Sequence, residues 1–282
     1  MKKQITHALI AVAAMLAEQA GAQTYDTNGV VVQTFAGSGF SGYVDGVGQQ
    51  TMFNNPNSIA ADSSNNLFVL DTGNQRIRKI TPDGRVSTFA GGGSGSIPGY
   101  GTNVSLNSYI GGGPTPMVID RSNTLWFMRT VNDTGILRIR NDGYVTIVNL
   151  TGATGGSGLC FDSGNNLYYS DPTVCCGNKI YRWRTNGVLE VFAGSGNAGY
   201  ADGNGIFTAF NSPSTLAADA ADNIYVWDSG NSLIRRIDQS QNVTTFAGKY
   251  ANASSADGIG TNAAFNSISQ MCVDSSGNLL LA

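Results

Sequence analysis

The sequence repeats one unit along most of its length, and this repetition constrains the fold more than any other feature. The unit is clearest between residues 32 and 91, where it opens with VQTFAG and closes with VSTFAG. Between these segments come DGVG and then FNNPNSIAADSSNNLFVLDTGNQRIRKITPDG. A unit of this size that recurs to the end of the chain predicts a repeat architecture, in which each copy forms one supersecondary unit.

Within one copy, short runs of apolar and β-branched residues alternate with turn sequences. We predict strands at residues 32–35, 58–61, 67–70, 77–80 and 86–89. The segments DSSNN, DTGNQ and PDG between the last four strands are strong turn signals, because Asp, Asn and Gly favour hairpin geometry. These four strands are therefore expected to form one antiparallel sheet.

The unit returns down to the last residue, and an aspartate ends its first strand each time. These aspartates are Asp62, Asp120, Asp162, Asp219 and Asp274, at spacings of 58, 42, 57 and 55 residues. The third copy comes early because it lacks the long loop with the D-G-x-G motif that precedes the others. We call this segment the leading loop.

The order of the motifs resembles the NHL repeat: FAG, D-G-x-G, F-N, D-S-x-G-N-L-Y-V-x-D, G-N-x-x-I-R-x-I, D-G and V-x-T-F-A-G. The resemblance covers about residues 30–282, and the first, fourth and fifth copies match well. The second and third copies depart, and Arg129 stands where Asp71, Asp171 and Asp228 carry aspartate. The resemblance implies an all-β fold, a β-propeller in which each repeat supplies one four-stranded antiparallel blade.

The strand count predicts a ring that is not closed by this sequence. Four blades are complete, the fifth has two strands, and segment 32–35 is a spare strand at the N-terminal side. We expect a C-terminally truncated piece of a longer protein and, by resemblance to the family, a fragment of a six-bladed ring. We also expect the chain alone to fold poorly or to associate through open sheet edges.

Residues 1–22 have the three parts of a secretory signal peptide. Lys2 and Lys3 form a basic start, residues 8–16 an apolar core, and residues 20–22 a small-residue cleavage site. An apolar core of this length is too short to span a bilayer. We therefore expect residues 23–30 to be a lead-in and residues 31–282 to be a secreted or periplasmic propeller, with no membrane contact after processing.

The expected mature chain is acidic and has no histidine. Removal of Lys2, Lys3 and Glu18 leaves 14 basic and 18 acidic residues, which disfavours nucleic acid as a partner. The single histidine, His7, leaves with the signal, so a histidine base, a Ser-His-Asp triad and histidine-bound zinc are excluded. We assign no catalytic residue and no cofactor, and the sequence assigns no oligomeric state.

The long loops are the best candidates for a binding face. The leading loops 37–57, 91–116, 194–214 and 248–269 should share one face with the turns between second and third strands, including 172–178, because strand direction alternates within a blade. Loops of this length on a rigid scaffold are often functional. The candidate residues are Tyr43, Asp45, Tyr200, Asp202, Asp257, Arg129, Asp71, Asp171 and Asp228.

Two features of these loops leave alternatives open. The aspartates fit hydrogen-bonded turns, and calcium ligation is the alternative, although one carboxylate per loop is few for an ion that takes 6–8 oxygen ligands. Cys175 and Cys176 are candidate disulfide participants, bonded to each other or to a cysteine beyond the sequence. Cys160 and Cys272 share a first-strand position that favours small packed side chains.

Three functions are compared. The first is a secreted scaffold that binds a protein or glycan ligand through the leading loops. The second is a propeller-channel enzyme, similar to the peptide-amidating lyase or to lactonases, whose catalytic residues lie beyond Ala282. The third is RNA binding, which export and negative charge disfavour. The absent histidine and the repeated, unspecialised loops favour the scaffold.

Overall fold

The computed structural model describes residues 33–107, 109–110, 115–128, 135–149, 157–173 and 177–282. The expected signal peptide 1–22 and lead-in 23–30, together with His7, Arg129, Cys175 and Cys176, lie outside the described residues. The described chain contains strands and short 3₁₀ helices but no α-helix, and none of its helices is long and apolar enough to cross a membrane. The predicted all-β fold class, a β-propeller of antiparallel blades, is confirmed.

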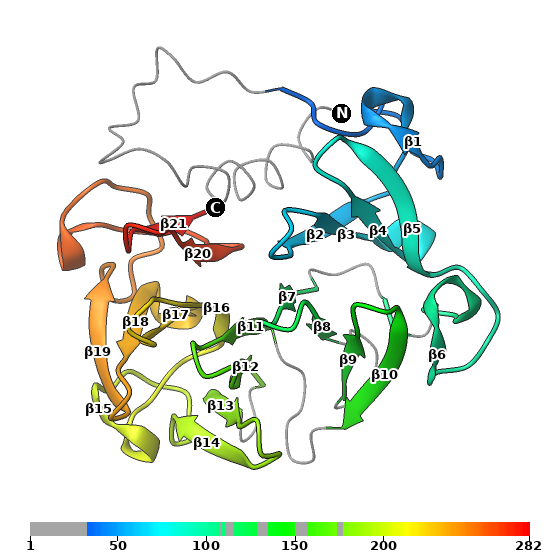
Figure 1. Ribbon diagram of the computed structural model, residues 1–282. Coiled ribbons are helices and arrows are strands. Elements are labelled where there is room, and N and C mark those ends of the chain that lie inside the picture. Colours follow the sequence, from blue (N-terminus) through cyan, green and yellow to red (C-terminus); the bar gives the residue numbers. More distant parts are fainter. Residues whose placement is uncertain (1–32, 108, 111–114, 129–134, 150–156, 174–176) are drawn as a thin grey trace. The chain divides into compact units, whose positions relative to one another are not determined.

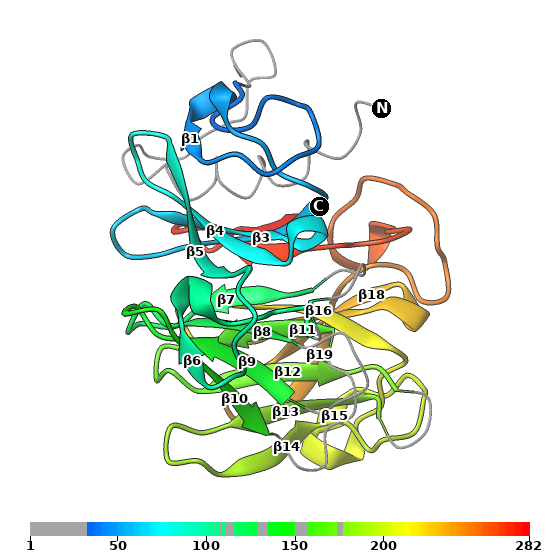
Figure 2. The same ribbon diagram turned by 90° about the vertical axis from the view of Figure 1, so that its right-hand side faces the viewer.

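The chain forms two compact units, of which the first comprises residues 1–131 and 135–148. Its two sheets have the strand orders β1-β5-β4-β3-β2 and β6-β10-β9-β8-β7 (Figure 1; Figure 2). The bounds in the first sheet are β1 Gly46–Val47, β2 Pro56–Ala61, β3 Leu67–Asp71, β4 Arg76–Ile80 and β5 Arg85–Gly91. Those in the second are β6 Gly99–Tyr100, β7 Met117–Ile119, β8 Leu125–Met128, β9 Gly135–Ile139 and β10 Tyr144–Asn149.

The second unit comprises residues 132–134 and 149–282 and holds sheets of four, five and two strands. Its strands are β11 Gly158–Phe161, β12 Leu167–Asp171, β13 Lys179–Trp183, β14 Leu189–Ala193, β15 Gly203–Asn204, β16 Pro213–Ala218, β17 Ile224–Asp228, β18 Leu233–Ile237, β19 Asn242–Ala247, β20 Met271–Val273 and β21 Leu279–Leu281. The 3₁₀ helices of both units are η1 Gly48–Gln50, η2 Thr72–Asn74, η3 Gly101–Asn103, η4 Gly205–Phe207, η5 Ser229–Asn231 and η6 Gly260–Asn262.

The sheets differ from the prediction in two respects. Three of them carry a fifth strand, since the two-residue strands β1, β6 and β15 of the leading loops pair with the outer strands β5, β10 and β19. Residues 33–35 form no strand, so the predicted spare strand is wrong for those residues. The two-residue strands lie in glycine-rich segments, where side-chain alternation is too short to define a strand.

The hairpin after each first strand is held by the repeated aspartate. One oxygen of Asp62 accepts the backbone N–H groups of Ser64 and Asn66 at 2.9 and 2.8 Å, and the other accepts the Asn66 amide at 2.8 Å. Asn65 lies between them at φ 61°, a left-handed conformation that Asn tolerates. The aspartate thus caps the turn, and the two bonds from the Asn four residues later recur at Asp162, Asp219 and Asp274.

The aspartates of these hairpins, together with Asp238 in the turn between β18 and β19, should make the stability of the protein depend on acid. Hydrogen bonds from Asn278 and Asn242 hold the pKa values of Asp274 and Asp238 below their usual range. At Asp219 burial raises the pKa, but bonds from Asn223, Ala221 and Tyr225 outweigh it and lower the pKa overall. A carboxyl whose folded pKa is depressed adds stability above its unfolded pKa of about 3.9, and loses it as pH falls through the folded pKa.

We therefore expect the urea midpoint to be constant from about pH 7 to pH 5 and to fall below about pH 4. The variant Asp219→Asn should show a shallower fall, because its turn no longer titrates. An acid dependence identical to that of the unchanged protein would contradict this role.

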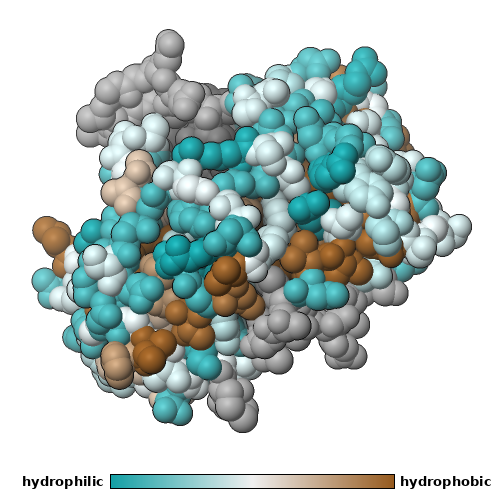
Figure 3. All heavy atoms as spheres, turned by 60° about the horizontal axis from the view of Figure 1, so that its bottom comes forward, coloured by the Kyte–Doolittle hydropathy of each residue, from teal (hydrophilic) through white to brown (hydrophobic). Residues whose placement is uncertain are grey.

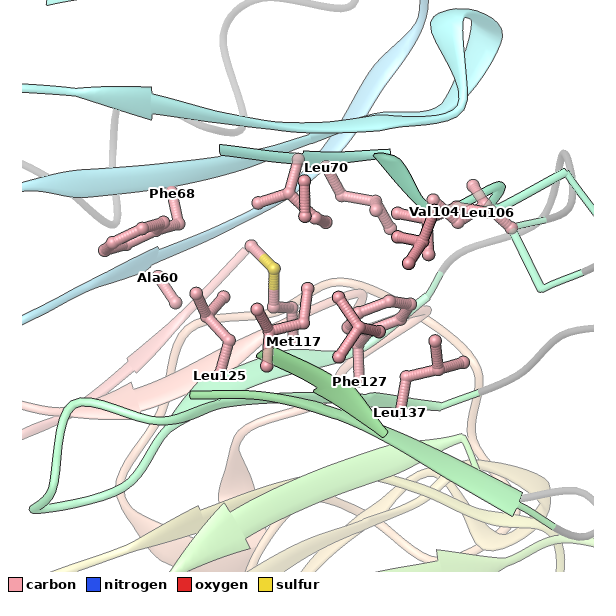
Figure 4. Close-up of a cluster of buried hydrophobic side chains, with 14 residues drawn as sticks. Ala60, Phe68, Leu70, Val104, Leu106, Met117, Leu125, Phe127 and Leu137 are labelled. Atoms are coloured by element: carbon pink, nitrogen blue, oxygen red, sulfur yellow. The ribbon is translucent and has the colours of Figure 1, made fainter. Parts of the chain in front are cut away.

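The core of the first unit lies between its two sheets. Leu70, Leu125, Phe127 and Leu137 are fully buried there, with Phe68 only 1% exposed. Figure 4 shows side chains from β2 and β3 pointing toward those from β7, β8 and β9, with Val104 and Leu106 beside them. The packing of sheet against sheet gives the leading loops a rigid base.

Candidate functional site

In the first sheet the leading loop and the turn after β3 lie together. Asn54 donates its backbone N–H to Asp71 at 2.7 Å and accepts that of Gly73 at 2.8 Å. The Asn74 amide donates to the carbonyl of Gly42 at 2.8 Å. Within this sheet, the two segments share one face as the strand directions predict.

The β16–β19 sheet of the second unit repeats this arrangement at matching positions. Asn211 donates to Asp228 at 2.7 Å and accepts from Gly230 at 2.9 Å, and the Asn231 amide donates to Gly199 at 2.8 Å. The two loops, which share Gly-Ser-Gly, Gly-Tyr-x-Asp-Gly and Phe-Asn at matching positions, thus adopt one hydrogen-bonding scheme.

A fully buried arginine joins each of these loops to its sheet. The Arg78 guanidinium donates to Asp71 at 2.9 Å and to Asp45 of the leading loop at 2.5 Å. It also donates to the loop carbonyls of Met52 and Val44 at 3.1 Å. We call this set of contacts the arginine clamp, and it fixes the loop at both ends of its D-G motif.

The second clamp is a close copy of the first. Arg235, also 0% exposed, donates to Asp228 at 2.9 Å and to Asp202 at 2.5 Å. Arg78 and Arg235 thus each pair within their own sheet. The reason is that the D-G motif folds back over the sheet that follows it and brings a carboxylate to the third strand.

Each clamp supports a tyrosine that remains half exposed. Tyr43 is 45% exposed, lies over Arg76 at 4.2 Å from ring centroid to guanidinium carbon, and its hydroxyl contacts that of Thr88 at 2.9 Å. Tyr200 is 42% exposed, lies 5.0 Å from Arg235, and its hydroxyl contacts that of Thr245 at 3.0 Å. Cation–π and hydroxyl contacts hold both rings in place, and each tyrosine remains nearly half exposed.

In the second unit, a further tyrosine extends this surface. Tyr250 is 55% exposed and stacks on Tyr200 with ring centroids 4.7 Å apart and an interplanar angle of 28°. The pair, which we call the tyrosine platform, is a preorganised aromatic surface bordered by Asp202 and Thr245. The sequence analysis missed Tyr250, which no motif marks.

The other candidate residues lie in different surroundings. Asp257 is exposed in its leading loop. Asp171 is buried and accepts from the backbone N–H and hydroxyl of Thr173 at 3.0 and 2.7 Å. Tyr181 occupies the position of Arg78 and Arg235 in its sheet and stacks on Tyr169, with centroids 5.0 Å apart. The β11–β14 sheet therefore contains no clamp among its described residues.

The described residues offer limited reactive chemistry. Cys160 and Cys272 are free thiols, and burial, with a smaller effect of the Asp162 carboxylate, raises the pKa of Cys160. Burial likewise raises the pKa of Tyr168 to about 12, and its hydroxyl donates to Asp162 at 3.0 Å. Within the described ranges, no three His, Cys, Asp or Glu side chains are grouped so that they could hold a metal ion.

A family comparison supports the repeat. Residues 53–80, which include β2, β3 and β4, match the NHL repeat. The chain therefore contains a segment that matches the NHL repeat. The matched NHL segment contains Asp71 and Arg78, two of the three clamp residues of its sheet. No curated protein matches the chain.

Solved structures show the same fold. A protein of unknown function from Bacteroides thetaiotaomicron VPI-5482 is 22% identical, with a TM-score of 0.55 over 89% of this chain and 72% of its own. Virginiamycin B lyase from Staphylococcus aureus is 15% identical, with a TM-score of 0.53 over 80% and 62%. A gluconolactonase from Xanthomonas campestris is 14% identical, with a TM-score of 0.51 over 80% and 68%. The NHL chain thus spans between 62% and 72% of the length of these proteins.

Proposed function

We propose that this NHL chain is a secreted or periplasmic binding scaffold whose leading loops recognise a protein or glycan ligand. The observation that carries the proposal is the tyrosine platform, Tyr200 on Tyr250, held half exposed by Arg235 and Thr245. An exposed aromatic surface that is already ordered contributes contact area with little loss of conformational entropy on binding.

The composition of the loops supports the same proposal. Segment 194–212 reads GSGNAGYADGNGIFTAFNS, and segment 248–266 reads GKYANASSADGIGTNAAFN. Tyrosine with Ser, Gly and Asn is the composition of antibody binding loops, in which rigid aromatic contacts combine with adaptable hydrogen bonds. In segment 194–212 the clamp restricts the flexibility that so many glycines would otherwise confer.

A glycan array and a binding assay test the proposal. We expect labelled protein to bind a subset of glycans, and Tyr200→Ala/Tyr250→Ala to weaken that binding at least about tenfold, because aromatic contacts dominate such surfaces. Tyr100→Ala is the matched control, since Tyr100 is 55% exposed on β6 and 4.7 Å from Tyr144, outside the platform. Equal binding by the double variant and the unchanged protein would contradict the platform as the binding surface.

The enzyme alternative is suggested by two of the structural neighbours, a lyase and a gluconolactonase. At 15% and 14% identity, these likenesses concern the fold only. A related structure is described as a catalytically inactive lyase with histidine replaced by alanine at one position, so that lyase needs a histidine. The tyrosine platform, in contrast, is an observation of this chain itself, and the scaffold is accordingly the function that we propose.

A further inference from the structure

The outer edges of three sheets are covered by the chain itself. Strand β1 pairs Gly46 with Val86 of β5, and Gly48 donates to the carbonyl of Gly84 at 2.9 Å. Next along the same edge, Asp45 accepts the Thr88 N–H at 3.4 Å. The edge of β19 is covered in the same way by Gly203, Gly205 and Asp202, and that of β10 by Gly99 and Gly101.

Among the described residues, the fourth outer strand, β14, has no such cover. Its sheet ends at β14, and only residues 150–157 join β10 to β11, whereas residues 194–212 join β14 to β16. By alignment of the repeats, Gly187, Leu189 and Val191 correspond to Gly84, Val86 and Thr88. No backbone bond across this edge exists among the described residues.

The backbone of β14 points its free groups outward at alternate residues. The backbone N–H and C=O groups of Val188 and Glu190 point toward β13. Arg184 donates its N–H to the Val188 carbonyl at 2.8 Å, and Glu190 pairs with Arg182 of β13 in the register of the sheet. Leu189 and Val191 therefore direct their N–H and C=O groups away from the sheet. An edge of this kind is a template for pairing with another strand.

Exposed apolar side chains lie beside this edge. Ile206 and Phe207 of η4 are 55% and 82% exposed. The face of the molecule in Figure 3 carries hydrophilic residues interrupted by separate hydrophobic patches. η4 is joined to the end of β14, because Gly194 donates to the carbonyl of Gly205 at 3.1 Å. The corresponding pairs in the other 3₁₀ helices are polar: Gln49–Gln50, Thr102–Asn103 and Thr261–Asn262. The apolar pair thus occurs only where the neighbouring strand is uncovered.

We propose that β14 pairs in antiparallel orientation with β14 of a second copy of this chain. A two-fold axis at Leu189 places Leu189 opposite its own copy and Val191 opposite Gly187, so the outward N–H groups of Leu189 and Val191 find acceptors. An isologous contact needs only one kind of open edge, and β14 provides it on both copies.

The charges on this edge favour a second copy. Glu190 already pairs with Arg182 at 2.5 Å and Arg184 at 2.8 Å, so two edges meet without an unpaired carboxylate. In the register given above, Glu190 lies opposite Val188, which is 48% exposed, and not opposite its own copy. Ile206 and Phe207 of both copies add apolar surface next to the shared sheet. This pairing is independent of ligand binding at the tyrosine platform.

Sedimentation velocity of the purified protein from about 1 to 100 µM tests the proposal. We expect a concentration-dependent monomer–dimer equilibrium. Val191→Pro removes one outward N–H from β14. An edge strand tolerates proline, and the variant should weaken the dimer at least about tenfold. Ile206→Thr/Phe207→Asn installs the polar pair of η3 and should act in the same direction, independently of any effect of proline on folding.

Ile259→Asn is the matched control, because Ile259 is 91% exposed in a different leading loop and should leave the dimer unchanged. A protein that remains monomeric throughout the concentration range would overturn the proposal. So would a dimer that persists in Ile206→Thr/Phe207→Asn, or one that is lost only in Ile259→Asn.

Discussion

Replacement of Arg235 by methionine is expected to destabilise the protein by about 3–5 kcal/mol, the cost of breaking a buried ion pair by removing one partner. Arg235 and Asp228 are both fully buried, and the change leaves the Asp228 carboxylate without its guanidinium. Methionine fills much of the same space, so a missing charge partner, more than a cavity, causes the loss. Urea unfolding followed by circular dichroism measures it.

Three further variants separate the charge from other effects. Arg235→Met/Asp228→Asn should regain a large part of the loss, because no uncompensated carboxylate remains. Arg78→Met tests the copy of the clamp in the first unit and should cost a similar amount. Arg140→Met, whose pair with Asp142 is exposed, should cost less than about 1 kcal/mol. Equal losses in Arg235→Met and Arg140→Met would contradict the account of the clamp.

The stability deficit of Arg235→Met should depend on pH in a defined direction. Burial raises the pKa of Asp228 despite the lowering effects of Asn211, Asn231 and Arg235. Loss of Arg235 removes one of the lowering effects, so the folded pKa of Asp228 in the variant lies above that in the unchanged protein. The deficit is therefore largest above the folded pKa of the variant, and it should shrink as pH falls through that value, because a protonated carboxyl needs no guanidinium.

Gly158→Ala is expected to cost about 2–3 kcal/mol, because β11 and β16 approach too closely for a side chain there. A Cβ on Gly158 would lie 2.2 Å from the carbonyl oxygen of Ser214 and 2.9 Å from the nitrogen of Leu216. Both contacts are with backbone, so β16 must shift to admit a methyl group. A thermal melt should show a fall of several degrees.

Gly199→Ala provides the control for Gly158→Ala. Its added Cβ would meet only the Ala209 side chain, at 3.4 Å, which is an ordinary contact distance. We expect a change of less than about 0.5 kcal/mol, as for substitutions away from special features. If both variants melt at the same temperature, the close approach of β11 to β16 carries no energetic weight.

The repeated sheets could be predicted from sequence because their signals are local. Alternating strands bracketed by DSSNN-type and PDG-type turns place β2–β5 within one or two residues of their observed bounds. The arginine clamps were not predicted, because a partner across the loop is not a local signal. The sequence nevertheless contained a signal for the clamps, since Asp45 and Arg78, like Asp202 and Arg235, are separated by 33 residues. Two carboxylates at matching distances from two arginines predict contact more strongly than either pair alone.

The tyrosine platform was predicted only in part. Tyr200 was recognised because Gly-Tyr-x-Asp-Gly occurs twice, but Tyr250 lies in a leading loop where no second copy repeats it. Its stacking on Tyr200 depends on how segment 248–252 crosses the preceding loop, which side-chain pattern does not encode. The uncovered edge of β14 was likewise visible only once β1, β6 and β15 were seen to cover the other outer strands.

The clamp also separates the path of a leading loop from the chemistry that the loop displays. In the first sheet, Asp45 and the carbonyls of Val44 and Met52 are held by Arg78, so the backbone course depends on few side chains. Val44 and Val47 are nevertheless 40% and 44% exposed. Residues at such positions can be exchanged without redirecting the chain. The surface that the loop presents can therefore vary while the sheet and its arginine keep the course of the backbone fixed.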